Sequence, residues 1–270
     1  MQSTSHANGR FVWFELMTTD PAAAIEFYGK VVGYTTESWG EGGGNYRMWK
    51  TPSGPTIGGI MELPQAARDM GAPPHWVGNL CVASVDEAVE KLKAHGGVVH
   101  HGPFDVPSIG RVAMVADAGG AGLALYQPEA MAPGHSEDQN VQGEISWVEL
   151  CTSDMDQAWA TYSDIGGWEK TDAMDMGPMG TYQMYGPQGK TIGGMMTKPP
   201  EMPFSAWLFY SWVDDLDAAV ASAVANGGTL VHGPQEVPGG SRVANLIDPQ
   251  GAHFALHGGR SAASNSNSAA

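Results

Sequence analysis

The sequence repeats itself, and this repetition limits the folds open to the chain more than any other feature. Residues 13–20 read WFELMTTD, and residues 147–154 read WVELCTSD, 134 positions later. Later blocks, HGPFDVPSIGRVAMVADAGGAGLAL and HGPQEVPGGSRVANLIDPQGAHFAL, keep the same order at a separation of 131. Because chance does not align so many blocks in one order, the sequence predicts a tandem duplication of about 130 residues.

The segment between the copies is rich in Pro, Gly and polar residues and has no periodicity, which is typical of a linker. The segment from Arg260 onward is a low-complexity run of Ser, Asn and Ala, a composition that favours disorder. The predicted organisation is a flexible N-terminus at 1–9, a first domain at 10–127, a linker at 128–143, a second domain at 144–258 and a disordered tail at 259–270.

Charge and composition exclude several classes of partner. Thirteen Lys and Arg against 29 Asp and Glu give a formal charge of −16. Nucleic acids and anionic membranes recruit basic surfaces, so we expect neither as a partner. No apolar run approaches the roughly 20 residues of a membrane span, and the polar N-terminus has no signal-peptide core, so we expect a cytoplasmic protein. Cys81 and Cys151 are too few for a disulfide framework and are expected to be reduced.

Within each copy, the same local pattern occurs twice. FVWFEL alternates apolar and polar residues and predicts a strand. Asp20 and Pro21 suit the N-cap and first turn of a helix, and Gly33 suits its end. The pattern recurs with the strand VGNLCVASV and a helix expected to start at Asp86. Short strands with Gly and Pro turns complete each unit, so the chain is predicted to be an α+β protein of four βαβββ units.

The order of these blocks resembles the vicinal oxygen chelate superfamily, which includes glyoxalase I, bleomycin-resistance proteins and extradiol dioxygenases. The resemblance covers about residues 10–258 and rests on the junctions TTD-PAAAIEFYGKVVG and TSD-MDQAWATYSDIGG, the helix VDEAVEKLKAHGG and the closing segments DAGGAGLAL and DPQGAHFAL. It implies that each pair of βαβββ units curls into one cup-shaped sheet that binds a ligand. The chain is therefore similar to fused two-domain glyoxalase-like proteins with two cups, named here cup one and cup two after the copy that supplies their first strand. The sequence does not tell whether each cup is built within one copy or by strands exchanged between the copies.

The resemblance places metal ligands on the first strand of each unit and on the closing strand. The matching positions here hold Trp13, Val77, Ala124, Trp147, Leu208 and Ala255. None of these side chains is an oxygen or nitrogen ligand for a divalent metal. We therefore expect no cofactor, while an unusual divalent metal site remains an open alternative.

Strand alternation predicts which side chains face each cup. On the first strands these are Trp13, Glu15 and Met17 in cup one, and Trp147, Glu149 and Cys151 in cup two. A carboxylate inside an apolar cup is costly unless it is paired, neutralised or used, and burial favours its protonated form, as a general base requires. The alternative is a structural glutamate bonded to the backbone, to Arg111 or to Arg242.

The same alternation assigns the remaining strands. Cup one adds Val77, Asn79, Cys81, Gly122, Ala124 and Tyr126, and cup two adds Leu208, Tyr210, Trp212, His253, Ala255 and His257. Cup two holds more groups that exchange protons near pH 7. The predicted catalytic residues are therefore Glu149, His253 and Tyr210, with Glu15 as the weaker counterpart. The predicted ligand-binding residues are Trp147, Cys151, Trp212, His257, Met176, Met179, Trp13, Asn79 and Tyr126.

Two recurrent features have structural and functional interpretations. Met176 and Met179 belong to a methionine-rich loop that suits varied apolar ligands and is interpreted as a lid over cup two, although an ordinary surface loop explains it nearly as well. The repeated TIGG segment is interpreted as a place of close packing within the sheet.

These features predict a glyoxalase-like enzyme that binds a small, largely apolar or aromatic molecule. Glu149 would act as a metal-independent general base in isomerase or lyase chemistry, and Tyr210 and a histidine would stabilise the oxyanion. The alternative is a drug- or toxin-sequestering protein of the bleomycin-resistance type. A third reading is a metal-dependent lyase or dioxygenase with non-standard ligands. The expected partner is a small molecule, and the expected state is a monomer or homodimer.

Overall fold

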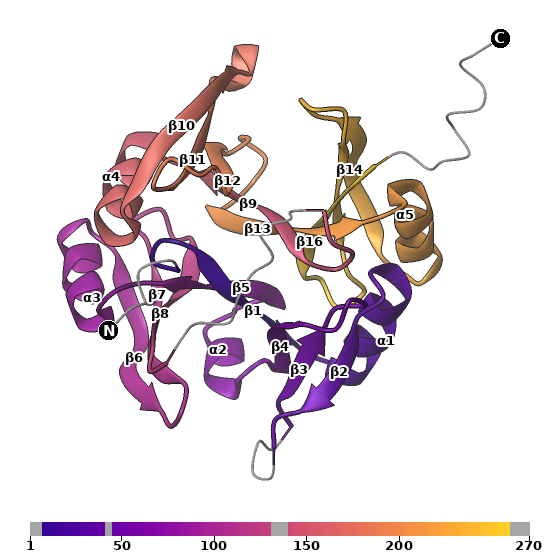
Figure 1. Cartoon of the computed structure of the whole chain (residues 1–270), viewed down its shortest axis with the longest axis horizontal. Coiled ribbons are helices and arrows are strands. Elements are labelled where there is room, and N and C mark those ends of the chain that lie inside the picture. Colours follow the sequence, from indigo (N-terminus) through magenta and orange to yellow (C-terminus); the bar gives the residue numbers. More distant parts are fainter. Residues whose placement is uncertain (1–6, 41–44, 131–139, 260–270) are drawn as a thin grey trace. The chain divides into compact units, whose positions relative to one another are not determined.

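The computed structural model describes residues 7–40, 45–130 and 140–259. In this part of the chain, four βαβββ units follow one another (Figure 1). The first copy contains β1 (Phe11–Thr18), α1 (Pro21–Val31), β2 (Thr35–Ser38), β3 (Arg47–Lys50), β4 (Thr56–Glu62), the short helix α2 (Gln65–Asp69), β5 (His75–Cys81), α3 (Val85–Ala94), β6 (Val98–Val106), β7 (Gly110–Ala116) and β8 (Gly122–Pro128).

The second copy repeats this order of strands and long helices, but its described residues have no counterpart of the short helix α2 and have a 3₁₀ turn inside the first hairpin. It contains β9 (Ile145–Thr152), α4 (Met155–Gly166), β10 (Trp168–Asp175), η1 (Gly177–Met179), β11 (Thr181–Pro187), β12 (Gly193–Thr197), β13 (Ala206–Val213), α5 (Leu216–Ala225), β14 (Thr229–Glu236), β15 (Arg242–Ile247) and β16 (His253–Gly258).

Each copy contributes one eight-stranded mixed sheet. The strand orders are β2-β3-β4-β1-β5-β8-β7-β6 and β10-β11-β12-β9-β13-β16-β15-β14. The first and last strands of every βαβββ unit pair in parallel, as in β1 with β4 and β9 with β12, and the hairpins between them are antiparallel. This topology confirms the predicted α+β class with tandem βαβββ domains.

Helix starts follow the predicted chemistry, with one correction. The Asp20 carboxylate accepts the Ala23 N–H at 3.0 Å and so caps α1, as predicted. The helix α3 does not start at Asp86. It starts at Val85, because the Ser84 hydroxyl accepts the Glu87 N–H at 3.3 Å and forms the cap. Asp86 lies instead in the first turn, where a negative charge is favourable beside the helix N-terminus.

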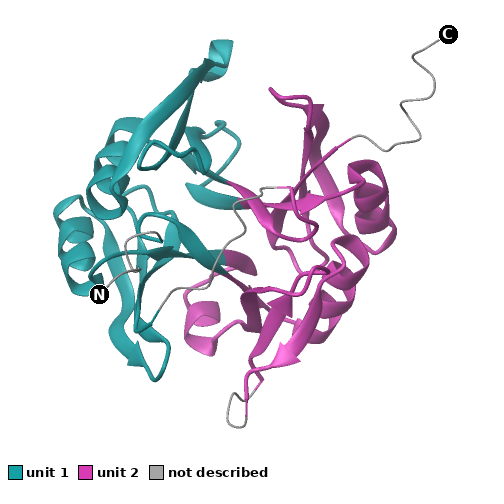
Figure 2. Ribbon diagram, viewed as in Figure 1, with its two compact units in different colours: residues 1–13, 77–135, 148–208 teal, residues 14–76, 136–147, 209–270 magenta. Residues whose placement is uncertain are grey.

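The chain divides into two compact units, and neither unit coincides with one copy (Figure 2). Unit 1 contains residues 1–13, 77–135 and 148–208, and unit 2 contains residues 14–76, 136–147 and 209–270. Unit 1 thus joins the second half of the first copy to the first half of the second. Unit 2 joins the two outer halves of the sequence.

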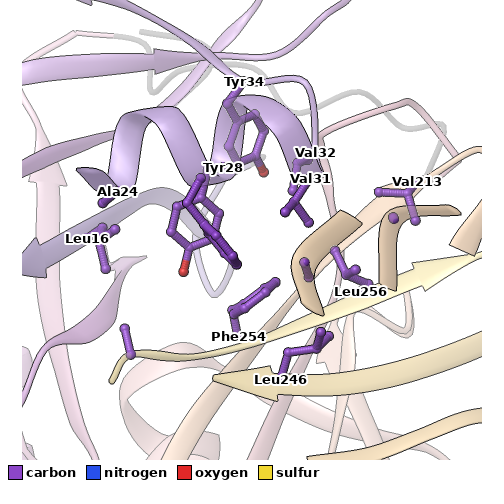
Figure 3. Close-up of a cluster of buried hydrophobic side chains, with 14 of the residues drawn as sticks. Leu16, Ala24, Tyr28, Val31, Val32, Tyr34, Val213, Leu246, Phe254 and Leu256 are labelled. Carbon is purple, nitrogen blue, oxygen red and sulfur yellow. The ribbon is translucent and has the colours of Figure 1, made fainter. Parts of the chain in front are cut away.

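The core of unit 2 shows how the copies combine. It is a single cluster of buried residues in which Leu16 and Tyr28 of the first copy lie with Leu246, Phe254 and Leu256 of the second (Figure 3). Inside this unit α1 packs beside α5 (Figure 1). Because apolar side chains from both copies are removed from water together, the hydrophobic stabilisation of this core belongs to neither copy alone.

Buried hydrogen bonds cross between the copies inside each unit, and one of them in each unit joins a tyrosine to an aspartate. In unit 2 the Tyr28 hydroxyl donates to Asp248 Oδ2 at 3.1 Å, and in unit 1 the Tyr162 hydroxyl donates to Asp117 Oδ2 at 3.0 Å. Each aspartate also accepts backbone N–H groups of its own turn, for example that of Ala252 at 2.9 Å. Burial raises the pKa of both carboxyls, so these donors are needed to hold the charge away from water.

Parts of the predicted organisation lie outside the described residues. These are residues 1–6 of the predicted N-terminal segment, 131–139 of the predicted linker and 260–270 of the predicted tail. Residues 7–9 form a turn in which the Gly9 N–H donates to the Cys81 carbonyl at 2.8 Å. The domain boundaries themselves stay a prediction. No helix in the described ranges is long and apolar enough to cross a membrane.

A fragment of residues 1–133 is expected to fail as a monomer. Alone, it would expose the faces of α1 and α3 that here pack against α5 and α4 of the second copy. We expect insoluble protein or a self-associated species in light scattering coupled to size exclusion. A stable, cooperatively unfolding monomer of this fragment would contradict the shared cores.

Candidate functional site

Each copy places a tyrosine hydroxyl on a glutamate that points away from the helix-facing side of its sheet. In unit 2 the Tyr46 hydroxyl donates to Glu15 Oε1 at 2.8 Å. In unit 1 the Tyr182 hydroxyl donates to Glu149 Oε2 at 3.0 Å. Both glutamates are half-buried, while their strand neighbours Leu16 and Leu150 are fully buried on the opposite face.

The strand register explains how the tyrosines reach the glutamates. Gly59 of β4 pairs with Glu15, and Gly194 of β12 pairs with Glu149. A Cβ atom on either glycine would overlap the ring of Tyr46 or of Tyr182. Each ring therefore lies across bare glycine backbone, and this position carries its hydroxyl to the carboxylate. The second glycine of the repeated TIGG segment has no side chain, and the tyrosine ring occupies the space that a side chain would fill.

Sequence reasoning missed both tyrosines, although the signal was present. Tyr46 begins YRMWK and Tyr182 begins YQMYG, and each stands a similar distance before its TIGG segment. Strand alternation predicts the face of the sheet that a side chain occupies. It does not predict that a tyrosine two strands away from the glutamate extends its ring over a glycine of the strand between them. The retention of Tyr, Gly and Glu in both copies was the available clue.

The second copy adds a thiol to the pair. Cys151 Sγ donates to Glu149 Oε1 at 3.9 Å, whereas the first copy has Met17 at this position. Burial, with further contributions from the charge and hydrogen bond of Glu149, raises the pKa of Cys151 to about 12. Cys151 is therefore a protonated donor near neutral pH and not a nucleophile.

Four further residues predicted for cup two, Tyr210, Trp212, His253 and His257, lie in unit 2. Tyr210 is buried on β13, and Trp212 is half-buried two residues later. His253 is exposed at the start of β16, and His257 is half-buried with both ring nitrogens hydrogen-bonded. Desolvation lowers the pKa of both histidines, with Asp248 opposing the shift at His253. Joint action of Glu149 with Tyr210 and His253 stays a prediction, since these residues belong to different units.

In cup one, two predicted ligand contacts make structural hydrogen bonds. The Asn79 amide donates to the Trp13 carbonyl at 3.3 Å, and the Tyr126 hydroxyl donates to the Ile109 carbonyl at 3.0 Å. Burial raises the pKa of Tyr126. A role for these side chains in ligand binding stays a prediction, as it does for Trp147.

The methionine-rich loop is the tip of the β10–β11 hairpin. Met176 caps the 3₁₀ turn η1 and is half-buried, and Met179 is 50% exposed. This placement leaves both the lid and the ordinary-loop interpretations open.

The arginines proposed as structural partners of the glutamates bind other carboxylates. Arg111 donates to Asp86 at 2.8 and 2.9 Å and to Asp105 at 2.9 Å. Arg242 donates to Asp217 at 2.8 Å.

The donor set does not fit the metal that the superfamily resemblance implies. Within residues 7–40, 45–130 and 140–259, no three His, Cys, Asp or Glu side chains lie together as metal ligands would. Val77, Ala124 and Ala255, at three of the expected ligand positions, are buried aliphatic side chains. The residues that the structure describes therefore provide no conventional site for a divalent ion.

The sheets of βαβββ units define the class of protein, and comparison with known families agrees. A family model described as the Glyoxalase/Bleomycin resistance protein/Dioxygenase superfamily matches residues 10–125 and 144–256. The chain belongs to this superfamily.

Relatives of similar length match almost the whole chain. CFP32 of Mycobacterium bovis, whose name describes it as a glyoxylase, is 34% identical over 247 residues, covering 90% of this chain and 92% of the relative. The anthracycline biosynthesis protein DauV of Streptomyces sp. strain C5 is 30% identical over 267 residues, with 94% of each chain covered.

Solved structures share the fold at low sequence identity. The 2,3-dioxygenase LapB from Pseudomonas sp. KL28 superposes with a TM-score of 0.62 at 12% identity, covering 93% of this chain and 92% of LapB. A Mn(II)-bound glyoxalase from Novosphingobium aromaticivorans superposes with a TM-score of 0.62 at 15% identity, covering 93% and 82% of the two chains. At these identities the likeness shows the fold alone.

The chain is expected to purify without a stoichiometric transition metal, because the superfamily ligand positions hold no suitable donor. Elemental analysis by plasma mass spectrometry of the full chain measures this directly. One equivalent of metal per chain, whose removal by a chelator lowers the melting temperature, would contradict the prediction.

Cys151 is expected to resist alkylation because only on the order of one thiol in 10⁴ is ionised at pH 8 when the pKa is about 12. Glu149→Gln should accelerate the reaction with iodoacetamide, since it removes the carboxylate that helps to raise this pKa. Cys81, whose pKa burial raises to about 11, is the internal control and should not change. Peptide mass spectrometry separates the two sites. Equal acceleration at both cysteines would show a loosened fold instead of a lost charge.

Proposed function

We propose that the chain is a glyoxalase-like enzyme in which Glu149 acts as a general base on a small, largely apolar or aromatic molecule. The observation that carries this proposal is the Tyr182–Glu149 hydrogen bond of 3.0 Å. This hydrogen bond orients the Glu149 carboxylate, as a general base must be oriented to reach the proton that it removes. The next residue on the same strand, Leu150, is buried on the opposite face, and its packing fixes the position of Glu149.

The chemistry that suits this pair is proton transfer at a carbon or hydroxyl next to a carbonyl group. When Glu149 removes the proton from the carbon, the electron pair of the C–H bond moves into the carbonyl oxygen of the ligand; when it removes the proton of the hydroxyl, the charge stays on that oxygen. The Tyr182 hydroxyl, released from Oε2 as the glutamate becomes protonated, turns to this oxyanion and stabilises it. Return of the proton to a neighbouring atom completes an isomerisation, and departure of a neighbouring group completes a lyase reaction.

The second copy is favoured over the first because of the residue beside the glutamate. Cys151 provides a protonated thiol at 3.9 Å from Glu149, and Met17 has no hydrogen to donate at the matching position. The Glu15–Tyr46 pair therefore makes a natural internal control for the Glu149–Tyr182 pair.

The names of the relatives support the ligand class and the type of reaction. DauV and DnrV, each 30% identical to this chain, are named for the biosynthesis of anthracyclines, which are fused-ring aromatic compounds with carbonyl groups. CFP32 is named as a glyoxylase. A carbonyl-bearing aromatic molecule fits both names and the proton transfer proposed for Glu149.

A second candidate function is sequestration of a ligand without turnover, as in bleomycin-resistance proteins. The formal charge of −16 favours this for a cationic compound. The metal-dependent alternative with non-standard ligands is addressed by the elemental analysis above.

The test uses an anthracycline ketone as the probe, incubated with the full chain in D₂O. We expect protein-dependent exchange of a proton next to the carbonyl for deuterium, detected by NMR. Glu149→Gln should lower the exchange rate by at least ~100-fold, and Tyr182→Phe by a smaller factor, because loss of a general base costs that much. Binding, followed by fluorescence of the probe, should persist in both variants.

The matched variants Glu15→Gln and Tyr46→Phe provide the control and should retain most of the exchange. Equal losses from Glu15→Gln and Glu149→Gln would refute the preference for the second copy. Tight binding with no exchange in the unaltered chain would favour the sequestering function.

A further inference from the structure

At one matching position of the fold, the first copy has apolar side chains and the second copy has hydrogen-bonded polar side chains. In unit 1, Val12, Cys81 and Tyr126 form a small apolar cluster, and Gly110 stands at the end of the nearby turn. The corresponding residues of the second copy, in unit 2, are Ser146, Trp212, His257 and Ser241. The first copy shows that the fold does not need polar residues here, so folding alone does not explain the serines and the histidine.

In unit 2 these residues form a continuous chain of hydrogen bonds. Ser146 Oγ lies 2.9 Å from His257 Nδ1, and Ser241 Oγ lies 2.8 Å from His257 Nε2. Ser146 also donates its hydroxyl proton to the Tyr210 carbonyl at 3.2 Å. A hydroxyl has one proton, so Ser146 must accept from Nδ1–H, and Nε2 must accept from the Ser241 hydroxyl.

This assignment fixes the tautomer of His257, with the proton on Nδ1 and the free electron pair on Nε2. The basic nitrogen, Nε2, accepts a hydrogen bond from Ser241, and Ser146 orients the ring through its hydrogen bond with Nδ1. A serine is activated when a base lies within hydrogen-bond reach of its hydroxyl and a third group orients that base. Desolvation lowers the pKa of His257, which keeps the ring neutral and able to accept a proton near pH 7.

Ser241 is half-buried and lies at the end of a glycine turn. Ser241 follows the Pro-Gly-Gly turn before β15, and its carbonyl accepts the Val237 N–H at 2.9 Å, which fixes the end of the turn. Added Cβ atoms on Gly239 and Gly240 would meet no atom within 4 Å, so the two glycines before the serine are not packed against other described residues. The Trp212 ring lies edge-on to His257 at 4.8 Å between centroids and offers an apolar wall beside the base.

We propose that Ser241 is a nucleophile for acyl transfer, with His257 as its general base and Ser146 as the residue that positions His257. The substrate class is an uncharged ester with a small acyl group and an apolar or aromatic leaving group. This site is separate from the Glu149–Tyr182 pair and does not depend on the function proposed for that pair.

In the reaction, Ser241 Oγ bonds to the ester carbonyl carbon while its proton passes to His257 Nε2. Collapse of the tetrahedral intermediate breaks the bond to the leaving oxygen, which takes that proton and departs as an alcohol or phenol. A water molecule then attacks the acyl-serine and gives its proton to Nε2. The carboxylic acid leaves, and the proton on Nε2 returns to Ser241, so the enzyme is restored.

A fluorophosphonate probe tests the nucleophile in the full chain. It forms an oxygen–phosphorus bond at an activated serine and releases fluoride, so it adds a fixed mass. We expect one adduct per chain, located on Ser241 by peptide mass spectrometry. Hydrolysis of p-nitrophenyl acetate should accompany it and fall by at least ~100-fold in Ser241→Gly. No adduct in the unaltered chain, or an adduct at another residue, would overturn the proposal.

The first copy supplies substitutions that the fold already accepts. Ser241→Gly and His257→Tyr install the residues found at Gly110 and Tyr126, and both should abolish labelling while the melting temperature changes little. His232→Ala is the control, because His232 lies in the same unit but bonds to Gln235, and it should label normally. Persistent labelling of Ser241 in folded His257→Tyr would refute the role of the base.

Ser146 requires a readout that distinguishes positioning from packing. Ser146→Ala should slow labelling by at least ~10-fold and shift its pH profile, because Nδ1–H loses its acceptor and the preferred tautomer. Ser146→Thr, which retains the hydroxyl, should restore both. An unchanged pH profile in Ser146→Ala would remove Ser146 from the mechanism.

Discussion

A buried phenol–carboxylate hydrogen bond, made once in each compact unit, is the interaction on which the rest of the structure depends. Tyr28 donates to Asp248 in one unit, and Tyr162 donates to Asp117 in the other. In each pair the tyrosine comes from a helix of one copy and the aspartate from the closing turn of the other. A buried carboxylate needs its donors, so either copy alone would lose the phenol that donates to the aspartate and would expose an apolar helix face.

The packing of the cores also explains how β9 holds Glu149 in position. β9 has Val148 and Leu150 in the interior on one face and Glu149 on the other. Packing on the inner face fixes the backbone, and a fixed backbone places the carboxylate where Tyr182 can reach it across Gly194. Groups held in this way lose little entropy when they act on a ligand, which is the advantage of a preorganised site.

The two copies share one set of polar residues and differ in another. Both copies retain the glutamate, the tyrosine and the glycine beneath it, which points to a shared requirement of the sheet or of its ligand. Only the second copy has Cys151 beside the glutamate and the chain of Ser146, His257 and Ser241. The first copy fills the latter place with Val12 and Tyr126, so it provides a folded reference for each substitution that tests the second.

The sequence by itself determined the duplication, the βαβββ order, the cap at Asp20 and the alternation that turns Glu15 and Glu149 away from the helix-facing side. These depend on residues close together in the chain, where periodicity and capping chemistry are readable. Tertiary structure alone decided that the units interleave the copies, that Tyr182 covers Glu149, and that His257 rests between two serines. Those contacts join residues from 16 to 220 positions apart, and their geometry follows from the packing of whole strands and helices, which no local pattern records.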